Sequence, residues 1–235
     1  MEPAVDVAPR PRGRPRSFDR EAALARAVRV FWARGYEGTS IADLLRAMQI
    51  TPPSLYAAFG SKEQLFQEAV AHYARVEASG TSLGLARAKT ARAGVEAMLR
   101  ANADAYATPG KPSGCMVVLG ATLGAPANEA VREFLARLRG QAQDDVQHRL
   151  EAAVADGELP PGTDTAGMAL FYATVLQGLS LQARDGVGRA GLQRIVDGAM
   201  AAWDVYTGRA RAVGTPPCAE TAEGSRPRGV DPTIL

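Results

Sequence analysis

The chain has 235 residues and a formal net charge of +2, and 46% of its residues are hydrophobic, as in ordinary globular proteins. This composition argues against a largely disordered chain. The longest apolar run, around residues 116–123, is too short to cross a bilayer, and the N-terminus has no apolar signal core, so we expect a soluble cytoplasmic protein. The two cysteines and two histidines are widely separated, which predicts no disulfide framework, no metal site and no cofactor.

The excess positive charge lies near the N-terminus. Residues 1–62 hold ten Lys or Arg against six Asp or Glu, a net charge of +4, whereas the remainder carries −2. Prolines forbid a regular helix in residues 1–17, where Arg14 and Arg16 end an alternating run of arginines. We expect a flexible basic arm that contacts nucleic acid. The alternative is a tail that only improves solubility.

Residues 18–78 are predicted to form a small helical domain. The first helix begins after Asp19 and ends at about Arg34, before Gly35 in a left-handed cap. The second, capped by Thr39 or Ser40, repeats apolar residues at positions 41, 44, 45 and 48, which is one face of a helix. A fourth helix begins after the cap at residue 61 and continues to about residue 76.

The third helix of this domain is short and follows the second after a tight turn. Thr51 is its expected cap, Pro52 occupies the first helical position, and Leu55 and Phe59 form its buried face. Two short helices joined in this way are typical of a helix-turn-helix unit, whose second helix enters the major groove of DNA. The sequence therefore predicts a DNA-binding protein.

Candidate DNA-contacting residues lie in the basic arm and around the two short helices. We predict that Tyr56 places its hydroxyl on a phosphate; the alternative is a half-buried core aromatic with its hydroxyl in water. Proline and serine offer little hydrogen bonding to bases, so part of the specificity is expected to come from DNA shape. The full candidate set is Arg14, Arg16, Thr39, Thr51, Pro53, Ser54, Tyr56 and Lys62.

Residues 17–76 resemble the DNA-binding head of the TetR family of bacterial transcriptional regulators. The residues that carry this resemblance are Leu24, Ala27, Phe31, Gly35, Tyr36, Thr39, Ile41, Ala42, Leu44, Leu45, Ile50, Thr51, Ser54, Leu55, Tyr56, Phe59 and residues 61–65. The pair Pro52–Pro53 departs from the pattern, because many members carry a polar residue and a glycine there. This departure is expected to change the DNA sequence that is read.

The resemblance implies an all-α homodimer of about nine helices per subunit. Helices 1 to 3 would form the DNA-binding head, and a C-terminal helical body would bind a small effector and dimerise through its last two helices. In this sequence the body corresponds to residues 79–207, followed by a disordered tail over residues 208–235 that includes Cys218. Body helices are predicted over residues 90–106, from residue 113, over 128–155, from 164 to before 186, and through 192–206.

The body residues are harder to assign than those of the head. Candidates for an effector cavity are Met98, Tyr106, Cys115, Met116, Leu119, Phe134, Phe171, Tyr172 and Gln177, and each of them could instead be ordinary core. Candidates for the dimer interface are Leu192, Ile195, Val196, Ala199 and Trp203. Trp203 could equally cover the last helix within one subunit.

These observations predict a repressor that a small hydrophobic effector releases from a pseudo-palindromic operator. One alternative is a regulator in which Cys115, near a predicted helix start, senses oxidants or electrophiles. Another is a helical ligand-binding protein without DNA function. We do not expect an enzyme, because no arrangement of nucleophile, base or metal ligands is recognisable in the sequence.

Overall fold

The computed structural model describes residues 19–77, 84–121 and 125–208. Every regular element in these ranges is helical, so the predicted all-α class is confirmed. Within these ranges no helix has the length and hydropathy needed to cross a membrane. The predicted basic arm with Arg14 and Arg16, and the C-terminal segment with Cys218, lie outside the described residues.

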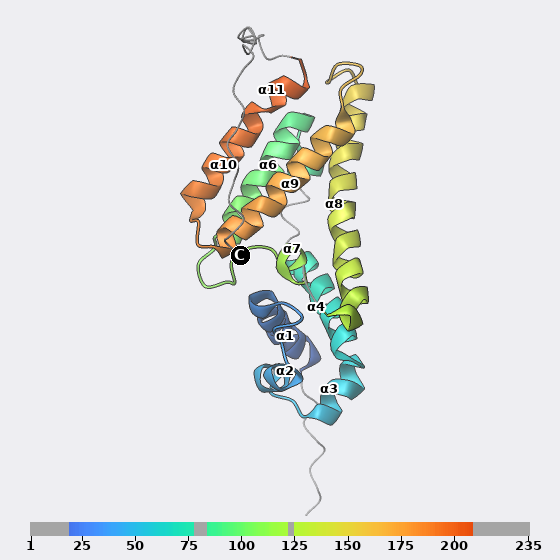
Figure 1. Cartoon of the computed structure of the whole chain (residues 1–235), viewed down its shortest axis with the longest axis vertical. Coiled ribbons are helices and arrows are strands. Elements are labelled where there is room, and N and C mark those ends of the chain that lie inside the picture. Colours follow the sequence, from blue (N-terminus) through green and yellow to red (C-terminus); the bar gives the residue numbers. More distant parts are fainter. Residues whose placement is uncertain (1–18, 78–83, 122–124, 209–235) are drawn as a thin grey trace, which may run out of the picture.

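Three helices form a small head at one end of the molecule (Figure 1). They are α1 (Arg20–Arg34), α2 (Ile41–Met48) and α3 (Pro52–Phe59). The expected caps largely hold: Asp19 accepts a hydrogen bond from the Ala22 amide, and Ser40, rather than Thr39, forms a capping box with Asp43. Thr51 precedes α3 but makes no side-chain cap bond.

Helix α4 (Lys62–Val76) connects the head to the body. Its Phe66 ring is fully buried and meets the rings of Phe31 and Tyr36 edge-on, with centroid separations of 5.0 and 5.2 Å. Such edge-to-face pairs stabilise beyond the apolar area they bury. The head therefore shares one core with α4 instead of folding around a core of its own.

The body is a bundle of longer helices. Its elements are α6 (Ala91–Tyr106), α7 (Met116–Leu119), η1 (Pro126–Asn128), α8 (Glu129–Ala155), α9 (Thr165–Arg184), α10 (Arg189–Ala201) and α11 (Trp203–Tyr206). In Figure 1 the long helix α8 runs along one side, α9 and α6 lie next to it, and α10 lies on the opposite side of the bundle. Thr90 and Asp164 cap α6 and α9 through their side chains, as their residue types favour.

Two predicted helices differ in the structure. The helix predicted from residue 113 begins only at Met116, because Gly114 adopts a φ of +76°, and it ends at Leu119 after four residues. The predicted last helix is divided into α10 and α11. At the division the Ala202 amide donates to the Ala199 carbonyl, a three-residue step that tightens the final turn of α10.

Candidate functional site

Burial of two residues of α3 determines which face of this helix is exposed. Leu55 and Phe59 are inside the head core, which turns Pro53 and Tyr56 toward solvent. Tyr56 is 50% exposed, and its hydroxyl makes no hydrogen bond to another described residue. At the start of the helix the hydroxyls of Thr51 and Ser54 lie 2.9 Å apart. The face therefore presents hydroxyl groups and prolines, with no charged side chain on α3 itself.

Two other residues predicted to contact DNA have structural partners within the head. Thr39 is buried, and its hydroxyl donates to the Gly35 carbonyl at 2.6 Å, so a phosphate contact by this side chain is not supported. The Lys62 ammonium lies 4.1 Å from the centroid of the Tyr36 ring. Burial lowers the pKa of Lys62, and the nearby Glu37 carboxylate opposes that change.

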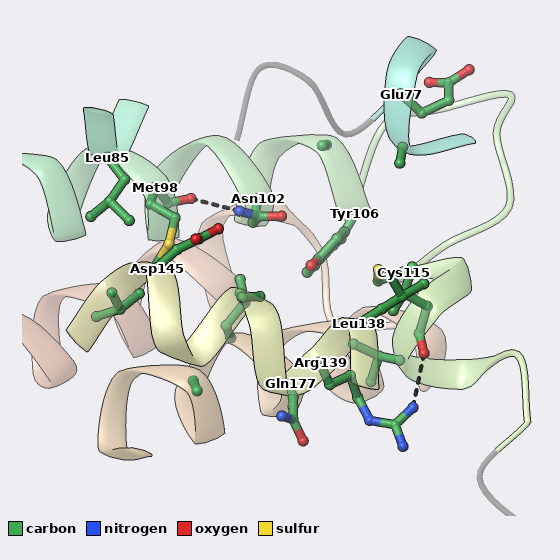
Figure 2. Close-up of a pocket in the computed structure, with 18 of the residues that line it drawn as sticks. Glu77, Leu85, Met98, Asn102, Tyr106, Cys115, Leu138, Arg139, Asp145 and Gln177 are labelled. Carbon is green, nitrogen blue, oxygen red and sulfur yellow. Dashed lines mark hydrogen bonds between the residues drawn. The ribbon is translucent and has the colours of Figure 1, made fainter. Parts of the chain in front are cut away.

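A cavity of about 240 Å³ opens in the body between five helices. Its walls come from α4, α6, α7, α8 and α9, and most of the side chains that line it are apolar (Figure 2). Tyr73, Asn102, Tyr106, Cys115, Arg139 and Gln177 supply polar groups. An apolar cavity with a few polar groups is the usual form of a small-molecule site.

Of the nine residues predicted to line an effector cavity, the structure brings four together. Met98, Tyr106, Cys115 and Gln177 line it; Met116, Leu119, Phe134, Phe171 and Tyr172 do not. Tyr172 is instead fully buried and packs on Phe171 and Trp203, with ring centroids 5.1 and 5.8 Å away. Apolar periodicity could not distinguish a wall residue from a core residue, and it gave no reason to select Arg139 or Tyr73.

Cys115 lines this cavity and is 9% exposed. Its thiol interacts with the hydroxyls of Tyr73 and Tyr106. Burial raises the pKa of both tyrosines, so their hydroxyls stay protonated and can act as hydrogen-bond donors. The Cys115 amide donates to the Ser180 hydroxyl at 2.8 Å, which fixes the residue against α9.

Residues 114–120, which we term the junction segment, contact both the cavity and the head. Cys115 and two valines of this segment line the cavity. On the other side, the Trp32 indole donates to the Gly114 carbonyl at 2.8 Å, and the Tyr36 amide donates to the Gly120 carbonyl at 2.7 Å. One short stretch of chain therefore connects the ligand-sized cavity directly to α1 and the residues after it.

A second link joins α9 to the end of α1. The Arg184 guanidinium donates to the carbonyls of Trp32 and Ala33, each at 2.8 Å. A cation at this position also interacts favourably with the negative end of the helix dipole. Arg184 therefore joins α9, which forms one wall of the cavity, to the C-terminal end of α1.

The predicted dimer residues lie mostly inside the subunit. Four of the five are buried in the subunit's own core, namely Leu192, Val196, Ala199 and Trp203, whereas Ile195 is 37% exposed. Other large apolar side chains on the surface of the last helices are Leu170 and Leu181 of α9 and Val205 of α11.

Among the described residues, no group of three or more His, Cys, Asp or Glu is placed to hold a metal ion.

An all-helical subunit with a helix-turn-helix head and a separate ligand-sized cavity defines a class of protein, the DNA-binding regulators of one-component type. Residues 23–69 match the family model described as bacterial regulatory proteins, tetR family. Residues 91–203 match the tetracyclin repressor-like C-terminal domain. The chain belongs to the TetR family and is a DNA-binding transcriptional regulator.

Similarity to known proteins covers most of the chain. It is 32% identical over 193 residues to the HTH-type transcriptional repressor ComR of Escherichia coli K12, covering 82% of this chain and 92% of ComR. It is also 32% identical to the repressor BdcR of the same organism over 178 residues, covering 74% of this chain and 83% of BdcR. A solved structure of the TetR family regulator CifR, with three cysteines replaced and bound to a 26 bp operator, is 49% identical with a TM-score of 0.78 and covers 81% of this chain and all of that one.

Proposed function

We propose that this protein is a repressor whose affinity for its operator falls when a small, largely apolar molecule occupies the cavity between α4, α6, α7, α8 and α9. The observation that carries this proposal is the junction segment, because three of its residues line the cavity while the carbonyls of Gly114 and Gly120 accept hydrogen bonds from Trp32 and Tyr36 of the head. A ligand that displaces this segment changes the position of the head without contacting it. The coupling requires that the ligand bind one conformer more tightly than the other.

In the proposed complex, α3 lies in the major groove with its hydroxyl-bearing face toward DNA. Tyr56 is the best-placed phosphate contact, since its hydroxyl is exposed and has no described partner. The N-terminal end of the helix presents Thr51, Pro53 and Ser54 to the DNA. The arm residues Arg14 and Arg16 are proposed to add phosphate or minor-groove contacts. Lys62 contacts DNA only if its ammonium moves away from the Tyr36 ring.

The proposed dimer places α9 and α10 of two subunits together. The exposed apolar residues Leu170, Leu181 and Ile195 support this arrangement, because large aliphatic side chains on one surface are covered in stable assemblies. The buried residues Leu192, Val196 and Trp203 would then support the face from beneath. A two-fold dimer also explains why a short recognition helix suffices, since two half-sites are read together.

Selection of bound duplexes from a random DNA pool tests this function. The expected result is an enriched pseudo-palindrome whose half-sites are separated by about one helical turn. The selected duplex then serves in a fluorescence-polarisation assay against a panel of small apolar compounds. A folded, dimeric protein that enriches no sequence, with or without compounds present, would refute the proposal.

A second candidate function is regulation through covalent modification of Cys115. It is favoured by the position of the thiol in the cavity, beside the hydroxyls of Tyr73 and Tyr106, which can donate hydrogen bonds to an incoming electrophile. With iodoacetamide the sulfur would bond to the methylene carbon, iodide would leave, and the thiol proton would pass to solvent. Loss of operator binding in the native protein but not in Cys115→Ser supports this function; unchanged binding after complete alkylation excludes it.

We also infer that the protein regulates transcription without enzymatic activity. The family consists of transcriptional regulators, and the cavity chemistry is sufficient for binding.

A further inference from the structure

Arg139 is the one cationic residue among those that line this largely apolar cavity in the described part of the chain. It lies on α8 and is partly buried, and it lines the cavity together with Leu138 and Val118. Burial lowers the pKa of Arg139 because it removes the guanidinium from water, and the interaction with Cys115 opposes that change. A cation in such a position normally has an anion beside it.

No described carboxylate fills that role. Arg139 forms no ion pair with another described residue, and its hydrogen bond within the described chain runs from Nη1 to the Val117 carbonyl at 3.1 Å (Figure 2). Two acidic residues do line the cavity, but Glu77 is paired with Lys111 at 2.5 Å. Asp145 is exposed, and it lies six residues further along α8, about 9 Å along the helix axis.

A second unused polar group lies toward the same end of the cavity. Gln177 of α9 is partly buried, and its amide makes no hydrogen bond to another described residue. In Figure 2 the side chains of Gln177 and Arg139 are drawn toward one end of the cavity, while Met98 and Asp145 lie at the other. The cavity thus has one end with unused hydrogen-bond donors and a middle walled by apolar side chains.

We propose that the effector is a small organic anion, with a carboxylate held by Arg139 and Gln177 and an apolar body lying along the wall formed by Met98, Leu138 and Val146. This inference rests on the proposed function, because it assigns the ligand of the same cavity. A guanidinium binds a carboxylate through two parallel hydrogen bonds, which are stronger than a bond to a neutral carbonyl. The Gln177 amide supplies a further donor.

The hydrogen bond from Arg139 to the Val117 carbonyl also connects effector binding to DNA release. An incoming carboxylate competes with the Val117 carbonyl for Arg139, and Val117 belongs to the junction segment. Three residues further on, the Gly120 carbonyl accepts the hydrogen bond of the Tyr36 amide in the turn between α1 and α2. Withdrawal of Arg139 therefore frees the junction segment on its cavity side at the moment the anion binds.

The test compares acids with their amides, which have almost the same shape but no charge. Octanoate and phenylacetate, each beside octanamide and phenylacetamide, are titrated into the full-length protein by calorimetry and into its complex with the selected operator. We expect each acid to bind the native protein about ten- to a hundredfold more tightly than its amide. In Arg139→Gln this preference disappears, and Arg139→Lys retains part of it.

Arg137→Gln is the matched control, because Arg137 lies on the exposed side of α8 and does not line the cavity. This variant removes the same charge and keeps the preference for acids. Amides that bind as well as their acids, a preference that survives in Arg139→Gln, or failure of both acids to bind would overturn the inference. Operator release by an amide but not by its acid would leave the proposed function standing while refuting the anionic effector.

Discussion

Replacing Trp32 with phenylalanine tests whether the head and the cavity are joined through the junction segment. The substitution keeps an aromatic ring against Tyr73, whose centroid lies 4.9 Å from that of Trp32. It removes the indole N–H that donates to the buried Gly114 carbonyl at 2.8 Å. A buried carbonyl left without its donor costs about 1–3 kcal/mol, a sizeable part of a typical stability of about 5–15 kcal/mol.

The assay is urea denaturation at a fixed protein concentration, since the stability of a dimer depends on concentration. Trp203→Phe is a matched control: Trp203 is equally buried, but its indole makes no hydrogen bond to another described residue. We expect Trp32→Phe to lower the free energy of unfolding by about 1–3 kcal/mol more than the control does. It should also bind operator but be released less completely by the effector. Equal destabilisation of the two variants, with normal release in both, would refute the role given to this hydrogen bond.

Three further predictions concern the junction, the DNA face and the dimer. Gly114→Ala adds a Cβ that would lie 2.6 Å from the Ser180 carbonyl, at a position where φ is +76°. Its melting temperature should fall well below that of Gly110→Ala, because Gly110 has a similar φ of +78° but open space around it. Equal melting temperatures would show that backbone strain alone matters. Tyr56→Phe should weaken operator binding about three- to tenfold without changing the slope of affinity against salt, because no charge is removed; unchanged affinity would place the hydroxyl in water. Leu181→Arg should shift the protein toward monomer in analytical ultracentrifugation and weaken operator binding, and an intact dimer would exclude this part of α9 from the interface.

The head was largely predictable because its determinants are local. Asp19, Ser40 and Ser61 cap helices within three residues of themselves, and the apolar positions of α2 follow a single helical period. Thr39 was predicted to contact DNA but is buried, for a short-range reason that the spacing of apolar residues does not show. Its hydroxyl reaches back one turn to the Gly35 carbonyl, so the side chain stabilises the turn between α1 and α2.

The cavity was only partly predictable because it depends on contacts between distant segments. Gly114 delays the start of α7 where it packs against Ser180, 66 residues later in the chain, and no local pattern encodes that approach. Arg139 looks like an ordinary solvent-facing residue of a long amphipathic helix. Its place in the cavity wall follows from how α8 packs against α7 and α9, which only the assembled bundle determines.

The links between body and head run largely through main-chain oxygens. The carbonyls of Gly114, Gly120, Trp32 and Ala33 accept the hydrogen bonds that join the two parts. A backbone carbonyl is present whatever side chain occupies the position, so these acceptors remain when apolar wall residues are exchanged, provided that the donors Trp32 and Arg184 and the wall residue Arg139 are kept. Recognition of a new small molecule could therefore arise by exchanging side chains around the cavity while the response to binding is retained, which makes this subunit a suitable scaffold for building sensors.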